Sequence, residues 1–243
     1  MAYVLIIGAK SDIAKALARE YASQGYDLYL GARSASELEA FANDLRIRTG
    51  REVICTELDV VDFDSHATFY ENLEHPLNGV ICTVGYLGEQ SVAQSDFQQA
   101  QQIIDTNYTG VVSLLNIIAD DFERKKEGFI IALSSVAGDR GRQSNYLYGS
   151  AKAALTAYLS GLRNRLFKAN VQVLTVKPGF VDTQMTAGMD LPEKLTAQPS
   201  EVAEIIYKAQ QKGKDVLYVK WMWQWIMLII RHIPEWLFKK TNL

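Results

Sequence analysis

Tyr148 and Lys152 have the side-chain types and the spacing that proton transfer requires. They open a stretch with a helical pattern, residues 148–168, and residues four apart share one face of a helix. A free tyrosine has a pKa of about 10, and a neighbouring ammonium group stabilises the phenolate and lowers that pKa. The pair therefore predicts a proton donor for a carbonyl group under reduction. Because the chain holds 12 tyrosines, this spacing alone also arises by chance.

Three other features strengthen the prediction because of where they stand. Ser135 follows a short apolar run, so its hydroxyl is expected at a strand end, where it can donate a hydrogen bond to a substrate oxygen. Asn107 lies inside a long helical pattern, residues 97–122, where asparagine is unfavourable. Residues 177–183 end a strand with a rigid turn whose backbone suits a nicotinamide carboxamide. The contacts predicted from that turn are Pro178, Gly179, Val181 and Thr183.

The N-terminal segment predicts a phosphate-binding turn. An apolar run leads directly into Gly8 and then into a helical pattern that begins near Asp12. In parallel α/β folds such a helix N-terminus offers free N–H groups and a positive dipole end to a phosphate. Asp12 stands where a glycine would normally let the backbone approach a pyrophosphate, so we expect its carboxylate to turn away, as a helix N-cap. The predicted contacts of the turn are Gly8, Lys10, Ser11, Asp12 and Ile13.

Residues after the next two strands predict the rest of the nucleotide site. NAD-binding folds usually place an acid after strand two, whereas NADP-binding folds use a nearby arginine for the 2′-phosphate. Here Ala32 replaces the acid and Arg33 follows, which favours NADPH over NADH. Lys10 adds a second positive charge there, or is a solvated loop lysine. Asp59, followed by Val60, accepts a hydrogen bond from the adenine amino group, or caps the next helix.

Short apolar runs alternate with longer helical patterns along most of the chain. The runs are residues 3–7, 27–30, 52–58, 79–84, 129–133 and 171–176. This alternation is typical of βαβ units, and so of a parallel sheet with helices on both faces. The length of 243 residues suits one α/β domain, residues 1–215, with a tail, residues 216–243. Residues 183–200 show little periodicity, which indicates either a functional lid or a plain surface loop.

Composition limits the partners and the location. Basic residues number 25 and acidic residues 28, which argues against nucleic acid as the main partner. The two cysteines and three histidines lack the spacing of a metal site. No uncharged apolar run reaches the length of a membrane span, about 18 residues, and the N-terminus lacks the features of a signal peptide. We therefore expect a cytoplasmic or membrane-peripheral protein without a metal.

The order of these features resembles that of single-domain short-chain dehydrogenase/reductases. The match spans nearly the whole chain and comprises the glycine turn, Asp59, Asn107, Ser135, the Tyr-x-x-x-Lys pair and Pro-Gly-x-Val-x-Thr. The resemblance implies a Rossmann-type doubly wound parallel sheet in three layers. It implies Tyr148 as the general acid, and Lys152 as the residue that tunes it and binds the nicotinamide ribose. It further implies that Ser135 orients the carbonyl and that Asn107 anchors a water relay.

Two motifs depart from the family pattern. In the glycine turn Asp12 and Ala14 replace two glycines, and the Asn-Asn-Ala-Gly motif after strand four is replaced by residues 82–85, which end in the cofactor contact Gly85. These departures affect the fine cofactor contacts and leave the catalytic set intact. Four features are also similar to those of decaprenylphosphoryl-2-keto-ribose reductases: the altered turn, residues 84–88, the Asn107-Tyr108 pair and residues 231–234. That resemblance implies reduction of a lipid-linked keto-pentose.

The C-terminal tail has an unusual composition. It holds four basic residues and one acid, and its wide apolar arc carries the tryptophans. These are Trp221, Trp223, Trp225 and Trp236. Such a helix suits a membrane interface, and a tail that packs in an oligomer interface or on the core has the same composition. Pro234 is expected to end or kink the helix.

These observations predict an NADPH-dependent reductase of a ketone, with a polyprenyl-phosphate-linked 2-keto-pentose as one candidate substrate. The alternatives are a reductase of another small or lipid ketone, such as a 3-oxoacyl chain, a nucleotide-binding scaffold without turnover, and a membrane-surface adaptor that uses the tail. The family resemblance implies a homodimer or homotetramer.

Overall fold

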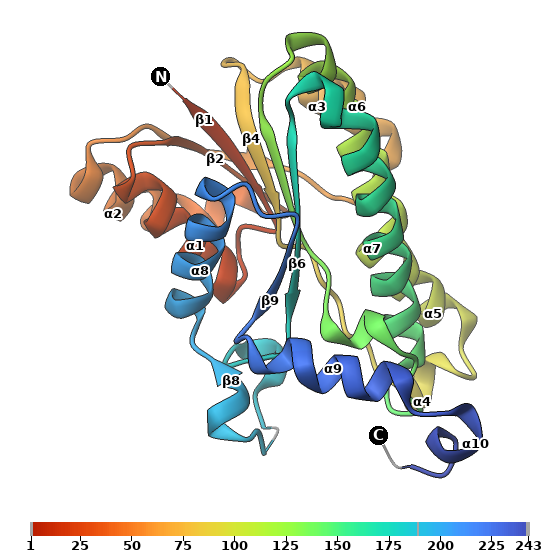
Figure 1. Cartoon of the computed structure of the whole chain (residues 1–243). Helices are drawn as coiled ribbons and strands as arrows, with labels where there is room; N and C mark the ends of the chain where they lie inside the picture. The colour runs from red at the N-terminus through yellow and green to blue at the C-terminus, as the bar shows by residue number, and fades with distance from the viewer. Residues whose placement is uncertain (1, 189, 242–243) are drawn as a thin grey trace.

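One parallel sheet between two layers of helices forms the protein (Figure 1). The computed structural model describes residues 2–188 and 190–241. The seven strands stand in the order β3-β2-β1-β4-β5-β6-β9, and every neighbouring pair is parallel. Their bounds are β1 Tyr3–Ile7, β2 Asp27–Ala32, β3 Val53–Glu57, β4 Leu77–Cys82, β5 Phe129–Leu133, β6 Gln172–Pro178 and β9 Val216–Val219. The predicted three-layer Rossmann-type fold is confirmed.

Helices cover both faces of this sheet. One face carries α1 Asp12–Ser23, α2 Glu39–Thr49 and α8 Pro199–Gln211, and the other carries α3 His66–Glu71, α6 Gly110–Lys125 and α7 Tyr146–Leu166. The central strands β1 and β5 are buried along their whole length because helices pack on both sides of them. This double burial explains why they are continuous apolar runs in the sequence.

Shorter elements gather at the carboxyl end of the sheet, where the strands point in Figure 1. They are α4 Gln90–Ala93, α5 Phe97–Ile104, the short helices η4 Val136–Asp139, η6 Gln184–Thr186 and η7 Glu193–Leu195, and the ribbon of β7 Phe180–Val181 with β8 Thr196–Ala197. The remaining short helices are η1 Ala35–Leu38, η2 Phe63–Ser65 and η5 Phe167–Ala169. The chain closes with α9 Met222–His232 and α10 Glu235–Phe238, which cross this same end.

Two parts of the fold differ from the sequence-based expectation. The helix expected over residues 97–122 is interrupted by a π-helical turn, Asp105–Thr109, which contains the buried Asn107. Residues 216–219, assigned to the tail, form β9 and pair with β6 in the main sheet. A four-residue edge strand is too short to give a clear period in the sequence.

Two expectations about the C-terminal third have clear outcomes. The segment 183–200 holds η6, η7 and β8 and then enters α8, so it is more ordered than its sequence indicates; residue 189 lies outside the described residues. Pro234 separates α9 from α10, as predicted. Within residues 2–188 and 190–241, no helix combines the length and the apolar character needed to cross a bilayer.

Candidate active site

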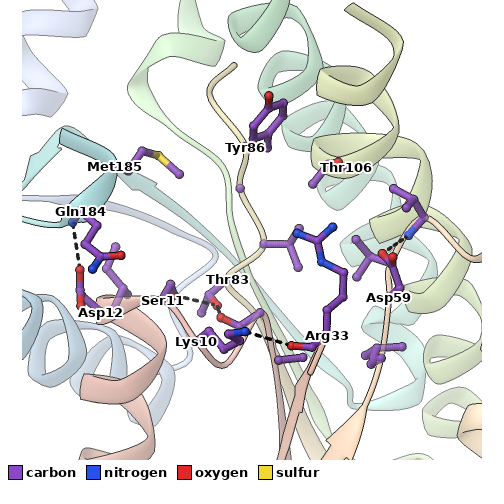
Figure 2. A pocket seen from close by; sticks show the side chains of 18 of the residues that line it. Lys10, Ser11, Asp12, Arg33, Asp59, Thr83, Tyr86, Thr106, Gln184 and Met185 are labelled. Carbon is purple, nitrogen blue, oxygen red and sulfur yellow. Dashed lines mark hydrogen bonds between the residues drawn. The ribbon is translucent and has the colours of Figure 1, made fainter. Parts of the chain in front are cut away.

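A cavity of about 470 Å³ opens where the strand order reverses, between β1 and β4 (Figure 2). In doubly wound sheets this crevice beyond the carboxyl ends of the strands is where ligands bind. Most of the cofactor contacts predicted from the sequence line it. They are Gly8, Lys10, Ser11, Asp12, Ile13, Arg33, Asp59, Val60, Gly85 and Thr183.

The turn between β1 and α1 has the geometry of an anion site. Gly8 has a φ of 80°, and a side-chain carbon there would lie 3.0 Å from Oγ1 of Thr83 and 3.2 Å from the Val84 nitrogen. Only glycine suits such a backbone in so little space. The first-turn N–H groups of α1 at Asp12 and Ile13 have no acceptor within a helix and line the cavity. The turn therefore fits a diphosphate.

The prediction that Asp12 is the N-cap of α1 is wrong, because the cap is Ser11. The Ser11 backbone is extended, and its Oγ accepts a hydrogen bond from the N–H of Ala14 at 3.2 Å. Asp12 is the first residue inside α1 and so follows the N-cap position by one residue. Its carboxylate instead accepts a hydrogen bond from the backbone N–H of Gln184 at 3.0 Å (Figure 2). Asp12 thus connects the phosphate-binding turn to η6.

Two cations stand at the end of β2. The exposed Arg33 side chain extends into the cavity (Figure 2). Lys10 donates to the Arg33 carbonyl at 3.3 Å and lies 2.6 Å from the Glu37 carboxylate. Lys10 is therefore held beside Arg33, as one of the two interpretations of the sequence expected. Both side chains fit a 2′-phosphate.

Glu57, at the end of β3, is a residue that the sequence analysis missed. Its carboxylate accepts hydrogen bonds from the N–H groups of Ser34 at 2.7 Å and Ala35 at 2.9 Å. These bonds, followed by the charge of Lys10, lower the pKa of Glu57. Because Glu57 takes these backbone donors, the side chains of Arg33 and Lys10 are the polar groups that line the cavity beside the end of β2.

The alternative in which Asp59 caps the next helix is wrong, because Asp62 is the N-cap of η2 and Ser65 is the N-cap of α3. Oδ1 of Asp59 accepts a hydrogen bond from the N–H of Val61 at 3.1 Å, which fixes the turn after β3. The residue also lines the cavity together with Val60. A carboxylate accepts more than one hydrogen bond, so this turn leaves it free to receive an adenine amino group.

The catalytic candidates meet at the start of α7. Ser135 stands beside Tyr148, where its side chain favours the charged form of the phenol, and its Oγ accepts a hydrogen bond from the Ala137 N–H at 3.1 Å. The Lys152 ammonium is buried 5.8 Å from the centre of the Tyr148 ring. It donates to the carbonyl oxygens of Val84 at 3.0 Å and Leu133 at 2.9 Å. The structure thus brings Ser135, Tyr148 and Lys152 together from the end of β5 and one face of α7.

Two glycines allow this close approach, and the sequence analysis assigned no role to them. A side-chain carbon on Gly138 would lie 2.7 Å from the Ala153 nitrogen, and one on Gly149 would lie 2.9 Å from the Ala137 oxygen. Both distances are shorter than those that real side-chain carbons show. Glycine at both positions lets η4 pack against α7, which sets Ser135 opposite Tyr148.

The predicted lowering of the Tyr148 pKa is wrong in this structure. Burial raises the pKa of Tyr148 to about 12, and the neighbouring Ser135 side chain offsets this rise only in part. Burial also lowers the pKa of Lys152, to about 8. The physical reason is that a buried site disfavours both charged forms. Tyr148 is therefore a protonated phenol at neutral pH, which is the form that a proton donor needs.

Asn107 is buried inside the π-helical turn and binds backbone groups. Its Nδ2 donates to the carbonyl oxygens of Tyr86 at 2.7 Å and Ile103 at 2.8 Å, and its Oδ1 accepts from the Tyr86 N–H at 3.2 Å. These bonds hold the segment after β4 against the interrupted helix. They explain how an asparagine is accommodated here, and the water relay stays a prediction.

Gly85 connects the cavity to the catalytic group. A side-chain carbon on Gly85 would lie 3.9 Å from the Lys152 ammonium and 3.5 Å from the terminal methyl of Met185. Gly85 and Met185 both line the cavity. Lys152 therefore lies near the end of the cavity where Met185 of η6 stands.

The turn after β6 is only partly as predicted. Among the described residues, Thr183 lines the cavity and begins η6, whereas Val181 is buried in the core. Gly179 lies against the tail, because a side-chain carbon there would lie 2.0 Å from the Trp223 ring. The indole of Trp223 donates to the Leu195 oxygen at 3.1 Å.

Several cavity residues were not predicted. They include Thr83, Tyr86, Gln102, Thr106, Gln184 and Met185. Thr83 could have been found from its place directly after β4, where its Oγ1 donates to the Ile7 oxygen at 2.8 Å. Gln184 and Met185 belong to the segment singled out as a lid, and nothing in its sequence marks these two positions.

Comparisons with known proteins agree with this geometry. A family model described as short chain dehydrogenase matches residues 2–194. An uncharacterized oxidoreductase of Mycobacterium tuberculosis is 36% identical over 98% of this chain and 96% of its own.

Two solved structures are similar to the whole fold. A short-chain dehydrogenase from Sphingobium yanoikuyae in complex with NADPH has a TM-score of 0.84 at 24% identity, and the match covers 97% of each chain. An alcohol dehydrogenase from the archaeon Thermococcus sibiricus, complexed with 5-hydroxy-NADP, has a TM-score of 0.77 at 26% identity. That match covers 90% of this chain and 94% of the other.

Proposed function

This chain belongs to the short-chain dehydrogenase/reductase family of NAD(P)-dependent oxidoreductases, and on that premise we propose that it reduces a ketone with NADPH. The observation that carries the proposal is the position of the Tyr148 ring, whose centre lies 5.8 Å from the buried Lys152 ammonium, with Ser135 beside it. These groups lie where the nucleotide cavity ends at Gly85.

The proposed mechanism assigns one task to each side chain. A bound nicotinamide supplies the hydride that the ketone carbon receives. Ser135 donates a hydrogen bond that orients the carbonyl oxygen. Tyr148 donates its phenolic proton to that oxygen as the carbon–oxygen double bond becomes a carbon–hydroxyl single bond. Lys152 binds the ribose hydroxyls of the cofactor and stabilises the phenolate that remains.

NADPH is proposed over NADH because of the charges after β2. Arg33 and Lys10 face the place of a 2′-phosphate, and Ala32 stands where NAD-binding folds carry an acid. The similar alcohol dehydrogenase from Thermococcus sibiricus was solved with 5-hydroxy-NADP. Both observations support a phosphorylated cofactor.

The more specific substrate that we propose is a 2-keto-pentose on a polyprenyl phosphate. Its support is the sequence similarity of the altered glycine turn, residues 84–88 and residues 231–234 to the reductases of such substrates. A 3-oxoacyl chain is the second candidate within the same reaction class.

The experiment follows NADPH oxidation with a panel of ketones: small cyclic ketones, a 3-oxoacyl thioester and a prenyl-phosphate 2-keto-pentose. We expect Tyr148→Phe to lower turnover by about 100- to 10,000-fold, with the NADPH dissociation constant unchanged. Tyr158→Phe is the matched control, because this tyrosine lies on the same helix and its hydroxyl binds Asn116 instead.

Two results would contradict the proposal. Full turnover by Tyr148→Phe would show that Tyr148 is not the general acid. NADPH binding by the wild type without turnover of any ketone in the panel would favour a nucleotide-binding scaffold.

A further inference from the structure

Helix α9 is apolar on two opposite faces. Its inner face is buried, with Trp223 4% and Met227 0% exposed, and packs on η4 and β7. At 100° per residue, the side chains at 221, 225, 228 and 229 point to the opposite side. On that side Trp221 is 70%, Trp225 58% and Ile229 67% exposed. A surface helix of a globular protein normally carries polar residues opposite its buried face.

The same kind of surface continues in α10, where Trp236 and Leu237 are exposed. We define the tail face as the exposed apolar side chains of these two helices. Its members are Trp221, Trp225, Leu228, Ile229, Trp236 and Leu237. Both helices lie across the carboxyl end of the sheet (Figure 1).

Arg140 holds α9 and α10 in place, so the tail face is a defined surface. Its guanidinium donates to the carbonyl oxygens of Ile230 at 2.8 Å and Ile233 at 2.5 Å. It also pairs with Glu235 at 2.8 Å and stacks 3.8 Å above the Phe238 ring. The bonds span some ninety residues of sequence and close the end of α9.

The charge around the tail face is positive. Arg231, Lys239 and Lys240 are exposed, whereas the acid of this segment, Glu235, is paired with Arg140. The chain as a whole has a net charge of −3, so this local excess of cations is distinct from the rest of the protein. Tryptophans with nearby basic residues are the composition that binds the interface of an anionic bilayer.

We propose that the tail face binds the headgroup–acyl interface of a membrane that contains anionic lipid. A second copy of the chain fits this face less well. A twofold contact would place the same cations of both copies together, and like charges across an interface oppose association. An anionic lipid surface neutralises these charges while the tryptophans enter the interface.

Docking in this way has a consequence for the reaction. The inner face of α9 contacts Gly179 and Phe180, which follow β6 on the side of the catalytic residues. This step rests on the proposed function: one helix then separates the site of ketone reduction from the lipid surface. A ketone with a long apolar chain reaches such a site without leaving the membrane.

Vesicle co-sedimentation of the full chain tests the proposal, with vesicles of phosphatidylcholine alone and of phosphatidylcholine mixed with phosphatidylglycerol. We expect binding to the mixed vesicles, and a decrease of about tenfold in the bound fraction for Trp225→Glu. The matched control is Ile47→Glu, on α2, where an isoleucine that is 85% exposed lies outside the tail face. Light scattering gives the mass of each protein without lipid.

Each outcome decides the proposal. Selective loss of vesicle binding in Trp225→Glu, at unchanged mass, supports it. Absence of vesicle binding by the wild type, or equal binding by Trp225→Glu, overturns it. A smaller mass for Trp225→Glu overturns it as well and assigns the face to a second copy. Turnover of a small soluble ketone is expected to be equal in wild type and Trp225→Glu. If neither protein turns over any ketone, the proposed reductase function is contradicted, whereas the result on vesicle binding still holds.

Discussion

The nucleotide cavity and the tail side of the site are built from different kinds of contact. Gly8 and Arg33 directly follow β1 and β2, and Asp59 lies two residues after β3, so the sheet alone brings them to one crevice. On the other side Trp223 packs on Gly179, and Arg140 binds the end of α9, across long stretches of sequence. We infer that changes in the first region alter mainly cofactor affinity, and that changes in the second alter mainly stability.

The largest expected effect tests the tail side. Trp223→Ala removes a buried indole that fills the space above Gly179 and donates to the Leu195 oxygen. We expect the free energy of unfolding to fall by about 3–5 kcal/mol, with a nearly unchanged dissociation constant for NADPH. Denaturant unfolding and a fluorescence titration measure the two quantities.

Trp221→Ala is the control for this change, because the side chain is exposed and belongs to the same segment. Its stability is expected to stay within about 0.5 kcal/mol of wild type. A stable Trp223→Ala protein would mean that the tail contributes little to the fold, and the comparison between the two regions would fail.

The corresponding change in the nucleotide cavity is expected to affect cofactor affinity and not stability. Arg33→Ala removes a charge-assisted contact to the 2′-phosphate, worth about 1.5–3 kcal/mol, and is expected to weaken NADPH binding by about ten- to a hundredfold. NADH binding and thermal stability should stay as in wild type. The control is Arg48→Ala, an exposed arginine of α2 that pairs with Asp44. Equal weakening of both cofactors would contradict the NADPH assignment.

The pH dependence of cofactor binding follows from Lys152. Burial lowers the pKa of Lys152 to about 8, so the side chain is charged below this pH and neutral above it. We expect NADPH affinity to decline as the pH rises through about 8, since the Lys152 ammonium loses its proton and with it its positive charge. Tyr148→Phe should show the same profile, because the pKa of Tyr148 is about 12. Constant affinity up to pH values well above 8 would argue against a cofactor contact by Lys152.

The smallest expected effect concerns Asp12, which connects the two regions. Asp12→Asn keeps an acceptor for the Gln184 N–H and removes a negative charge beside the phosphate-binding turn. We expect NADPH binding to tighten by about 0.2–1 kcal/mol with the Michaelis constant for the ketone unchanged. Asp12→Ala removes the acceptor too, and should raise that Michaelis constant. If both variants behave as wild type, the contact with η6 has no role in turnover.

Elements with strong local signals were predictable. The runs at residues 3–7 and 129–133 coincide with β1 and β5, because strands buried on both faces must be continuously apolar. Asp12 shows the limit of such signals. Its position indicated a cap, yet the cap depends on the backbone conformation of Ser11, and the Asp12 partner lies in a distant segment.

The Tyr148 pKa shows the same limit for chemistry. The spacing of Tyr148 and Lys152 is a property of the sequence, but the degree of burial is not. Burial outweighs the effect expected from a neighbouring ammonium, so the pKa of Tyr148 is raised and not lowered as predicted.

By itself the sequence determined the layered parallel fold and the family, and it predicted the nucleotide turn and the catalytic side chains. These depend on hydrophobic period and on short motifs at strand ends, which are local properties. Tertiary structure alone decided that residues 216–219 join the sheet, that Trp223 is buried and that Trp225 is exposed. The two tryptophans are chemically identical and two residues apart, and only the packing of α9 against Gly179 and Phe180 distinguishes them.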